Sequence, residues 1–203
     1  MTLHTWHRFS AFVLIAYVLL HLSNHVMAVA GPAAHVAFMD ALRPLYRNVV
    51  VEPLLLLCVL FQAGSGLWMV LKGWRGRRGA VAWLQAGSGM YLAFFMLFHV
   101  AAVLFGRAVL KLDTNFWYAA AGFTVRPYQL FFIPYYFLAI CALFAHLGCA
   151  LHWQARKCGP KARMAALALP ALSGALLALV VTLAFDGWLY RLDVPAQYLT
   201  IYK

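Results

Sequence analysis

The sequence predicts an all-α membrane protein, a single domain over residues 1–203 with five transmembrane helices. Hydrophobic residues make up 66% of the chain and charged residues only 10%, whereas soluble domains are about 25% charged. The chain contains five apolar stretches long enough to cross a bilayer, which takes about 20 helical residues. A soluble fold does not repeat such runs five times. The expected spans are Trp6–Ala30, Val51–Gly73, Ala82–Gly106, Tyr128–Trp153 and Ala162–Phe185.

Basic residues predict how the spans are oriented. They crowd the second and fourth connections, and positively charged connections stay on the cytoplasmic side of a membrane. We therefore expect the N-terminus in the cytoplasm, the C-terminus outside, and the protein in the cytoplasmic (inner) membrane of the cell. The basic residues of these connections are Arg75, Arg77, Arg78, Arg156, Lys157, Lys161 and Arg163.

The net charge of +11 does not indicate a protein that binds nucleic acid. The charges belong to short connections beside the membrane, and no nucleic-acid recognition motif accompanies them. The lipid bilayer, with its anionic headgroups, or an acidic soluble partner at the cytoplasmic face explains the charge better. On the opposite side, the connections Gly31–Val50 and Arg107–Pro127 are long enough to cover a site.

Single histidines lie deep inside the first, third and fourth spans, at His21, His99 and His146. An ionisable side chain inside hydrocarbon is costly unless it binds or pairs with another group. At a rise of about 1.5 Å per residue, His21 and His99 both lie about two-thirds of the way across from the cytoplasm. Two level histidines on non-consecutive helices can bind the two faces of one haem. We therefore predict that His21 and His99 are the axial ligands of a haem.

Other polar residues near these histidines are candidates for supporting roles. His25, one turn beyond His21, is expected to hydrogen-bond a haem propionate or a quinone rather than to bind iron. Glu52 opens the second span on the outer side, where a carboxylate could accept protons from quinol. Alternatively, Glu52 only offsets the dipole at the start of its helix. His4, His35 and His152 are expected to be ordinary residues of loops or span ends.

The order and spacing of several short segments resemble the single-chain cytochrome b membrane anchor of succinate dehydrogenases and fumarate reductases. The resemblance covers most of the first four spans, and its weight comes from the order of the segments rather than from any one motif. These segments are Trp6–Ser10, His21–Ser23, Phe61–Ala63, Gly66–Leu67, Leu84–Gln85, Ser88–Gly89, Phe98–Val100 and Phe144–His146.

The resemblance implies a bundle whose first four helices bind two haems b stacked across the membrane. His21 and His99 match the ligands of the outer haem, and His146 matches one ligand of the inner haem. Arg8 and Ser88 fall where the family contacts a haem propionate or quinone. The implied partners are an iron–sulfur subunit and a flavoprotein subunit on the cytoplasmic side, with membrane quinone as the substrate.

The sequence departs from this family at Gln62, where the family has the second histidine of the inner haem. A glutamine amide binds haem iron poorly compared with imidazole. The inner haem could then be absent, be held by His146 alone, or gain another ligand. Of these outcomes we favour absence, so one haem is expected and two is the alternative.

The chain holds no flavin or iron–sulfur motif, so it cannot oxidise succinate by itself. Its expected function is to pass electrons between quinone and an iron–sulfur subunit through haem b, as part of a succinate:quinone oxidoreductase or fumarate reductase of the respiratory chain. Two alternatives stay open. One is a stand-alone haem b protein of the same ancestry that reacts with quinone, and the other is a haem-free membrane scaffold or transporter.

Overall fold

Residues 2–202 are described by a computed structural model, which contains five helices long and apolar enough to cross a membrane. The prediction of an all-α, multi-pass membrane protein is confirmed, and no strand occurs between residues 2 and 202. The helices begin and end within three residues of the expected spans. They are α1 (Leu3–Met27), α3 (Val51–Lys72), α4 (Ala80–Ala108), α6 (Gln129–Gln154) and α7 (Gly159–Phe185), and the short helix η1 (Ala28–Ala30) extends α1.

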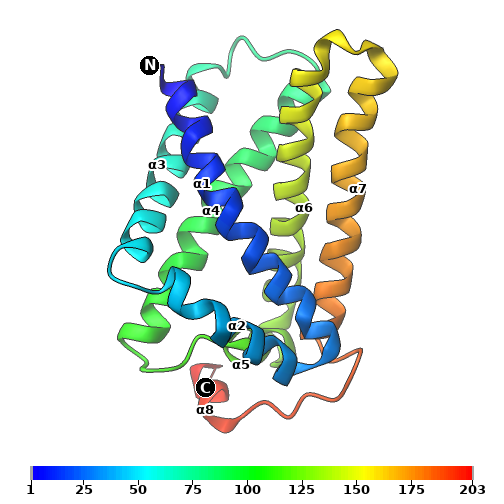
Figure 1. Cartoon of the computed structure of the whole chain (residues 1–203). Helices are drawn as coiled ribbons and strands as arrows, with labels where there is room; N and C mark the ends of the chain where they lie inside the picture. Colours follow the sequence, from blue (N-terminus) through cyan, green and yellow to red (C-terminus); the bar gives the residue numbers. More distant parts are fainter. Residues whose placement is uncertain (1, 203) are drawn as a thin grey trace.

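Short helices cover one end of this bundle. Helices α2 (Pro32–Tyr46), α5 (Phe116–Thr124) and α8 (Ala196–Leu199) lie at the end that carries the C-terminus, and the N-terminus lies at the opposite end (Figure 1). We call these the lower and upper ends, as they are drawn in Figure 1. The two connections that were expected to cover a site are therefore largely helical. Apolar residues of α5 seal the lower end, since Phe116 and Phe123 pack against Phe185 of α7.

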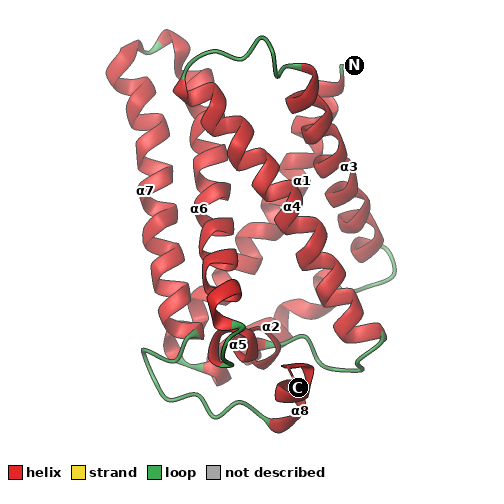
Figure 2. Ribbon diagram, turned by 180° about the vertical axis from the view of Figure 1, so that it is seen from behind, coloured by secondary structure: helices red, strands yellow, loops and turns green. Residues whose placement is uncertain are grey.

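The long helices form a ring. Helix α1 packs on α3, α3 on α4, α4 on α6 and α6 on α7, and α7 also contacts α1. Helices α1 and α4 both run obliquely across the bundle, as the two opposite views show (Figures 1 and 2). Glycine allows α6 and α7 to approach closely, because a methyl group added at Gly148 would lie 2.7 Å from the carbonyl oxygen of Leu167. That glycine therefore serves helix packing.

Charge is distributed unevenly between the two ends. All five acidic residues lie at the lower end, in α2, at the start of α3 and in the segments that follow α4 and α7. Among residues 2–202, the charged side chains of the upper end are all basic, whereas those of the lower end are of both signs. The basic residues at the upper end are Arg8, Lys72, Arg75, Arg77, Arg78, Arg156, Lys157, Lys161 and Arg163.

Candidate functional sites: two histidine clusters

Four histidines from three helices meet in the lower half of the bundle. His21 and His25 come from the last third of α1, His35 from α2 and His99 from α4, and we call this group the lower histidine cluster. The ring centres of His21 and His99 are 6.0 Å apart. The structure thus brings together the two histidines that the sequence placed at the same depth.

The separation of His21 and His99 fits a metal bound between them. Imidazole nitrogens bind a transition metal at about 2 Å, so two axial imidazoles on one iron have ring centres about 6 Å apart. Both side chains are only half-buried although they lie between helices. The donor set and its spacing therefore fit a haem, with His21 on one face and His99 on the other.

Aromatic rings surround the two histidines. Tyr17 stacks on His21 at 5.7 Å and Phe95 stacks on His99 at 5.1 Å. Tyr136 of α6 meets the edge of His99 at 5.9 Å. Such rings limit the rotation of an imidazole and exclude water around it, which is the environment a haem pocket needs.

Hydrogen bonds join the lower histidine cluster into a chain. The amide nitrogen of Asn24 can only donate, so His35 Nε2, at 3.2 Å, accepts. His25 Nδ1 lies 3.4 Å from the same His35 Nε2 and therefore donates to it. His25 Nε2 is left to accept from His21 Nε2 at 3.1 Å. Binding of iron by His21 Nε2 would replace this last hydrogen bond.

Two buried polar atoms in or beside this cluster have no partner within residues 2–202. They are Asn24 Oδ1 and His35 Nδ1, and the His35 side chain is only 3% exposed. Burial and the nearby charge of His21 lower the pKa of His35 to about 4, which keeps this ring neutral at physiological pH. A buried atom without a hydrogen bond is costly, so a polar group of a ligand that reached these two atoms would be stabilised.

The structure gives His35 a place that the sequence reasoning missed. His35 was expected to be an ordinary loop residue, but it is buried and touches both His25 and Phe116. The sequence did contain a pattern that indicates burial: His35 and Met39 are one helical turn apart, and both lie on the buried face of α2. Reading residues 32–46 as a helix with one buried face would have placed His35 inside.

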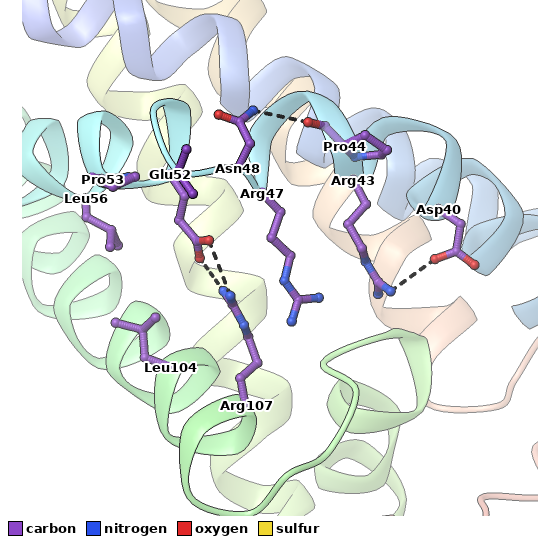
Figure 3. Close-up of a pocket in the computed structure, with 11 residues that line it drawn as sticks. Asp40, Arg43, Pro44, Arg47, Asn48, Glu52, Pro53, Leu56, Leu104 and Arg107 are labelled. Carbon is purple, nitrogen blue, oxygen red and sulfur yellow. Dashed lines mark hydrogen bonds and ion pairs between the residues drawn. The ribbon is translucent and has the colours of Figure 1, made fainter.

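Glu52 belongs to a separate pocket at the lower end. Its carboxylate accepts two hydrogen bonds from the guanidinium of Arg107, which ties α3 to α4 (Figure 3). The pocket has a volume of about 710 Å³, and Arg43 and Arg47 of α2 also line it. The role of Glu52 as a proton acceptor remains a prediction, but its immediate partner is a cation.

A second group of polar residues lies in the upper half, between α1 and α3. His7 Nδ1 is 2.7 Å from the hydroxyl of Ser65, and His7 Nε2 is 3.0 Å from the amide nitrogen of Gln62. Ser10 donates to Gln62 Oε1 at 2.6 Å and so fixes the direction of that amide. Gln62, which stands where the resembled family has a histidine, is thus held against an imidazole.

His146, between α6 and α4, is held by hydrogen bonds at Nδ1, as His7 is. Its Nδ1 lies 3.1 Å from the carbonyl oxygen of Gln85 and 3.2 Å from the hydroxyl of Ser88. Ser88, which the resemblance placed beside a propionate or quinone, therefore contacts a histidine directly. We call His7, His146 and their partners the upper histidine cluster. Arg8, the other residue proposed for such a contact, is exposed at the upper end.

A short repeat underlies the upper histidine cluster. The pentapeptide Gln-Ala-Gly-Ser-Gly occurs twice, at 62–66 on α3 and at 85–89 on α4. In each copy the serine contacts Nδ1 of a histidine, and a methyl group added at the last glycine would meet that ring. The sequence reasoning missed this repeat, although five identical residues in two spans would have pointed to it.

A haem with two axial ligands needs only a pair of histidines. Residues 2–202 contain no group of three or more His, Cys, Asp or Glu side chains arranged to hold a metal ion.

Comparison with known proteins gives no match: no family model, no curated protein and no solved structure is similar to this chain. Functional inference therefore rests on the two clusters themselves.

Proposed function

We propose that this chain is a haem b-binding membrane protein that exchanges electrons with membrane quinone. The observation that carries the proposal is the pair of histidines on α1 and α4 whose ring centres lie 6.0 Å apart. His21 and His99 would hold the haem, and Tyr17 and Phe95 would keep water from it. When bound, the haem supplies one-electron transfer across the interior of the bundle.

The lower histidine cluster also suits the proton chemistry of quinone. Reduction of a quinone takes up two electrons and two protons, so its site needs proton donors beside the electron carrier. The Nδ1 atom of His35 is buried without a partner and could donate to a quinone oxygen. The hydrogen bond from His25 to His35, which iron on His21 would leave in place, offers a path by which this proton could be resupplied.

Within this function, we assign the chain as the membrane anchor of a succinate:quinone oxidoreductase or fumarate reductase in the cytoplasmic membrane. The resemblance in spans one to four supports this assignment. The uniformly basic upper end supports it too, because a soluble iron–sulfur subunit with an acidic face could dock there, followed by a flavoprotein subunit. Catalysis of succinate–fumarate interconversion would belong to those partners.

The test is to purify the chain from haem-replete membranes and to measure haem b per polypeptide. We expect haem b that quinol reduces, and loss of this haem in His21→Ala and in His99→Ala. His4→Ala is the matched control, because His4 is exposed at the upper end. Haem-free protein would contradict the proposal and favour a membrane scaffold or transporter.

A second candidate differs only in its partners. Gln62 breaks the family pattern, and this observation favours a stand-alone haem b protein of the same ancestry that reacts with quinone. Purification under mild conditions separates the two, since an anchor brings down a flavoprotein that reduces fumarate or oxidises succinate. A haem protein that purifies without any flavoprotein would be the stand-alone form.

A further inference from the structure

We propose that the pocket at the lower end binds the phosphate of an anionic phospholipid, with Arg47 as the residue that recognises its charge. This is the pocket of about 710 Å³ that Glu52 and Arg107 line, and sites for small molecules measure about 300–1,000 Å³. The inference goes beyond the proposed function, because it involves neither haem nor quinone. It is supported by the lack of a partner for Arg47, by the fixed turn that carries this residue and by an apolar wall beside it.

Arg47 differs from the other two arginines of the pocket in its contacts. Arg107 is paired with the carboxylate at the start of α3. Arg43 lies 3.2 Å from the carboxylate of Asp40 and 2.9 Å from that of Asp113. Arg47 is half-buried, but its side chain has no ion pair and no hydrogen bond with any group of residues 2–202. Its five N–H donors are therefore available to an anion.

The backbone that carries Arg47 is fixed by the turn between α2 and α3. The amide nitrogen of Asn48 donates to two carbonyl oxygens in the last turn of α2, at 3.1 and 2.9 Å. Its Oδ1 accepts from two backbone amides at the start of α3, at 3.1 and 3.0 Å. Figure 3 shows Arg47 between the Glu52–Arg107 pair and Arg43. A ligand would thus meet a cation on a backbone that is already ordered, which lowers the cost of binding.

An apolar wall lies beside the arginines. Pro53 and Leu56 of α3 and Leu104 of α4 line the same pocket, and both helices are long and apolar enough to cross a membrane. Apolar side chains nearby are open to lipid, since Val49 is 91% and Leu57 64% exposed. A free anion does not benefit from an apolar wall, whereas a phospholipid carries acyl chains next to its phosphate. The combination therefore favours a lipid over free phosphate.

The charge of the lipid follows from the same contacts. The oxygens of a phosphate diester match the planar fork of a guanidinium. A zwitterionic headgroup also brings a cation, which three arginines would repel. A neutral ligand would leave Arg47 without an anion. We therefore expect phosphatidylglycerol, whose one negative charge is on its phosphate, to bind more tightly than phosphatidylcholine.

Native mass spectrometry of the full chain in neutral detergent tests the inference, because it counts bound lipid molecules. Titration with phosphatidylglycerol gives the Kd of the first lipid. We expect Arg47→Gln to raise this Kd about tenfold, as for the loss of a hydrogen bond to a charged group. Arg47→Lys keeps the charge without the planar fork, so it should raise the Kd less. Phosphatidylcholine should bind the native chain more weakly.

Two variants control for a general attraction of anionic lipid to a basic chain. Arg191→Gln removes an arginine at the lower end whose side chain is 88% exposed and does not line the pocket. Arg75→Gln removes an exposed arginine at the upper end. Neither should change the Kd. Without lipid, Arg47→Gln should unfold at the same temperature as the native chain, which separates a loss of binding from a loss of fold.

Four outcomes would overturn the inference. In the first, Arg47→Gln binds phosphatidylglycerol as tightly as the native chain does. In the second, phosphatidylcholine binds as tightly as phosphatidylglycerol. In the third, inorganic phosphate protects the chain from thermal unfolding as well as the lipid does, which would identify a site for a free anion. In the fourth, Arg47→Gln shifts the haem bands and leaves lipid binding unchanged, which would place a haem carboxylate at Arg47.

Discussion

The lower and upper histidine clusters hold their rings in different ways. In the lower cluster the imidazoles hydrogen-bond mainly to one another, from His21 through His25 to His35. In the upper cluster each imidazole is held separately, His7 by a serine of α3 and His146 by a serine and a carbonyl of α4. The first arrangement shares protons among rings, whereas the second fixes one proton on each ring.

This difference has chemical consequences. A chain of imidazoles can shift its protons along the chain, and the buried atoms of His35 and Asn24 that lack a partner within residues 2–202 would gain a hydrogen bond from a ligand. A ring held at Nδ1 cannot exchange that proton without losing its hydrogen bond, so its orientation is fixed. The lower cluster thus suits coupled proton and electron transfer, whereas the upper cluster ties α1 to α3 and α6 to α4.

The largest expected effect comes from filling the space beside one upper ring. In Gly89→Val the new side chain would press on His146, because even a methyl group there lies 3.0 Å from Cε1. We expect the free energy of unfolding to fall by up to about 3 kcal/mol, with the haem spectrum unchanged. Gly87→Val is the matched control, since nothing lies within 4 Å of a methyl group at Gly87. Equal stability of the two variants would show that the His146 ring does not pack tightly on α4.

A smaller effect is expected when the lower cluster is acidified. His35 has a pKa of about 4 in the folded protein and about 6.5 when unfolded. Because the unfolded chain binds the proton first, stability is lost as pH falls from about 6.5 toward 4. Linkage gives a loss of about 2 kcal/mol by pH 5, relative to pH 7.5.

The measurement is thermal unfolding of native protein and of His35→Gln in detergent at about pH 5 and about pH 7.5. The variant keeps polar atoms near Asn24 but does not titrate, so it should lose less stability on acidification. His21 and His25 are present in both proteins, so the difference between the two losses reports His35 together with its electrostatic effect on these neighbours. If both proteins lose equal stability between about pH 7.5 and about pH 5, protonation of His35 does not cause the loss.

The sequence was sufficient to predict the five spans and the level pair His21 and His99. Hydropathy alone determines the spans, because the bilayer demands long uninterrupted apolar helices. The depth of a histidine follows from its position in a straight helix, so the 6.0 Å approach of those two rings agrees with a calculation made from residue numbers. Both predictions depend on properties of a single helix: its hydropathy and its constant rise per residue.

The remaining contacts depend on how helices face one another, which spacing along one chain does not reveal. His35 enters the lower cluster only because α2 folds back beneath α1 (Figure 1). The contact of His7 with Ser65 joins residues 58 positions apart and depends on the rotation of α3 about its axis. Glu52 was expected at a helix start, but its pairing with Arg107 required the end of α4 to lie beside it.

The pairing of Glu52 gives the next prediction. Glu52→Gln leaves Arg107 without its anion in a partly exposed pocket, where such a pair is worth about 1 kcal/mol. We expect thermal stability to fall by about that amount, with haem content and quinol-driven haem reduction unchanged. The double variant Glu52→Gln/Arg107→Gln should recover part of the loss. A fall of tenfold or more in the reduction rate would instead identify Glu52 as a proton acceptor for quinol.

The smallest expected effect distinguishes the two upper rings from each other. A hydrogen bond of this kind contributes about 1 kcal/mol to stability, so its removal should lower the free energy of unfolding by about that amount. Ser65→Ala should approach this loss, because no other group accepts from His7 Nδ1 within residues 2–202. Ser88→Ala should lose less, since the carbonyl of Gln85 still accepts from His146.

Thermal unfolding in detergent measures both losses against the native protein. Ser23→Ala is the matched control: Ser23 also donates to a carbonyl of its own helix, but it is exposed and holds no histidine. Equal losses for Ser65→Ala and Ser88→Ala would mean that the carbonyl of Gln85 does not hold His146. A carbonyl oxygen can only accept, so the assignment of the His146 proton to Nδ1 would then lose its support.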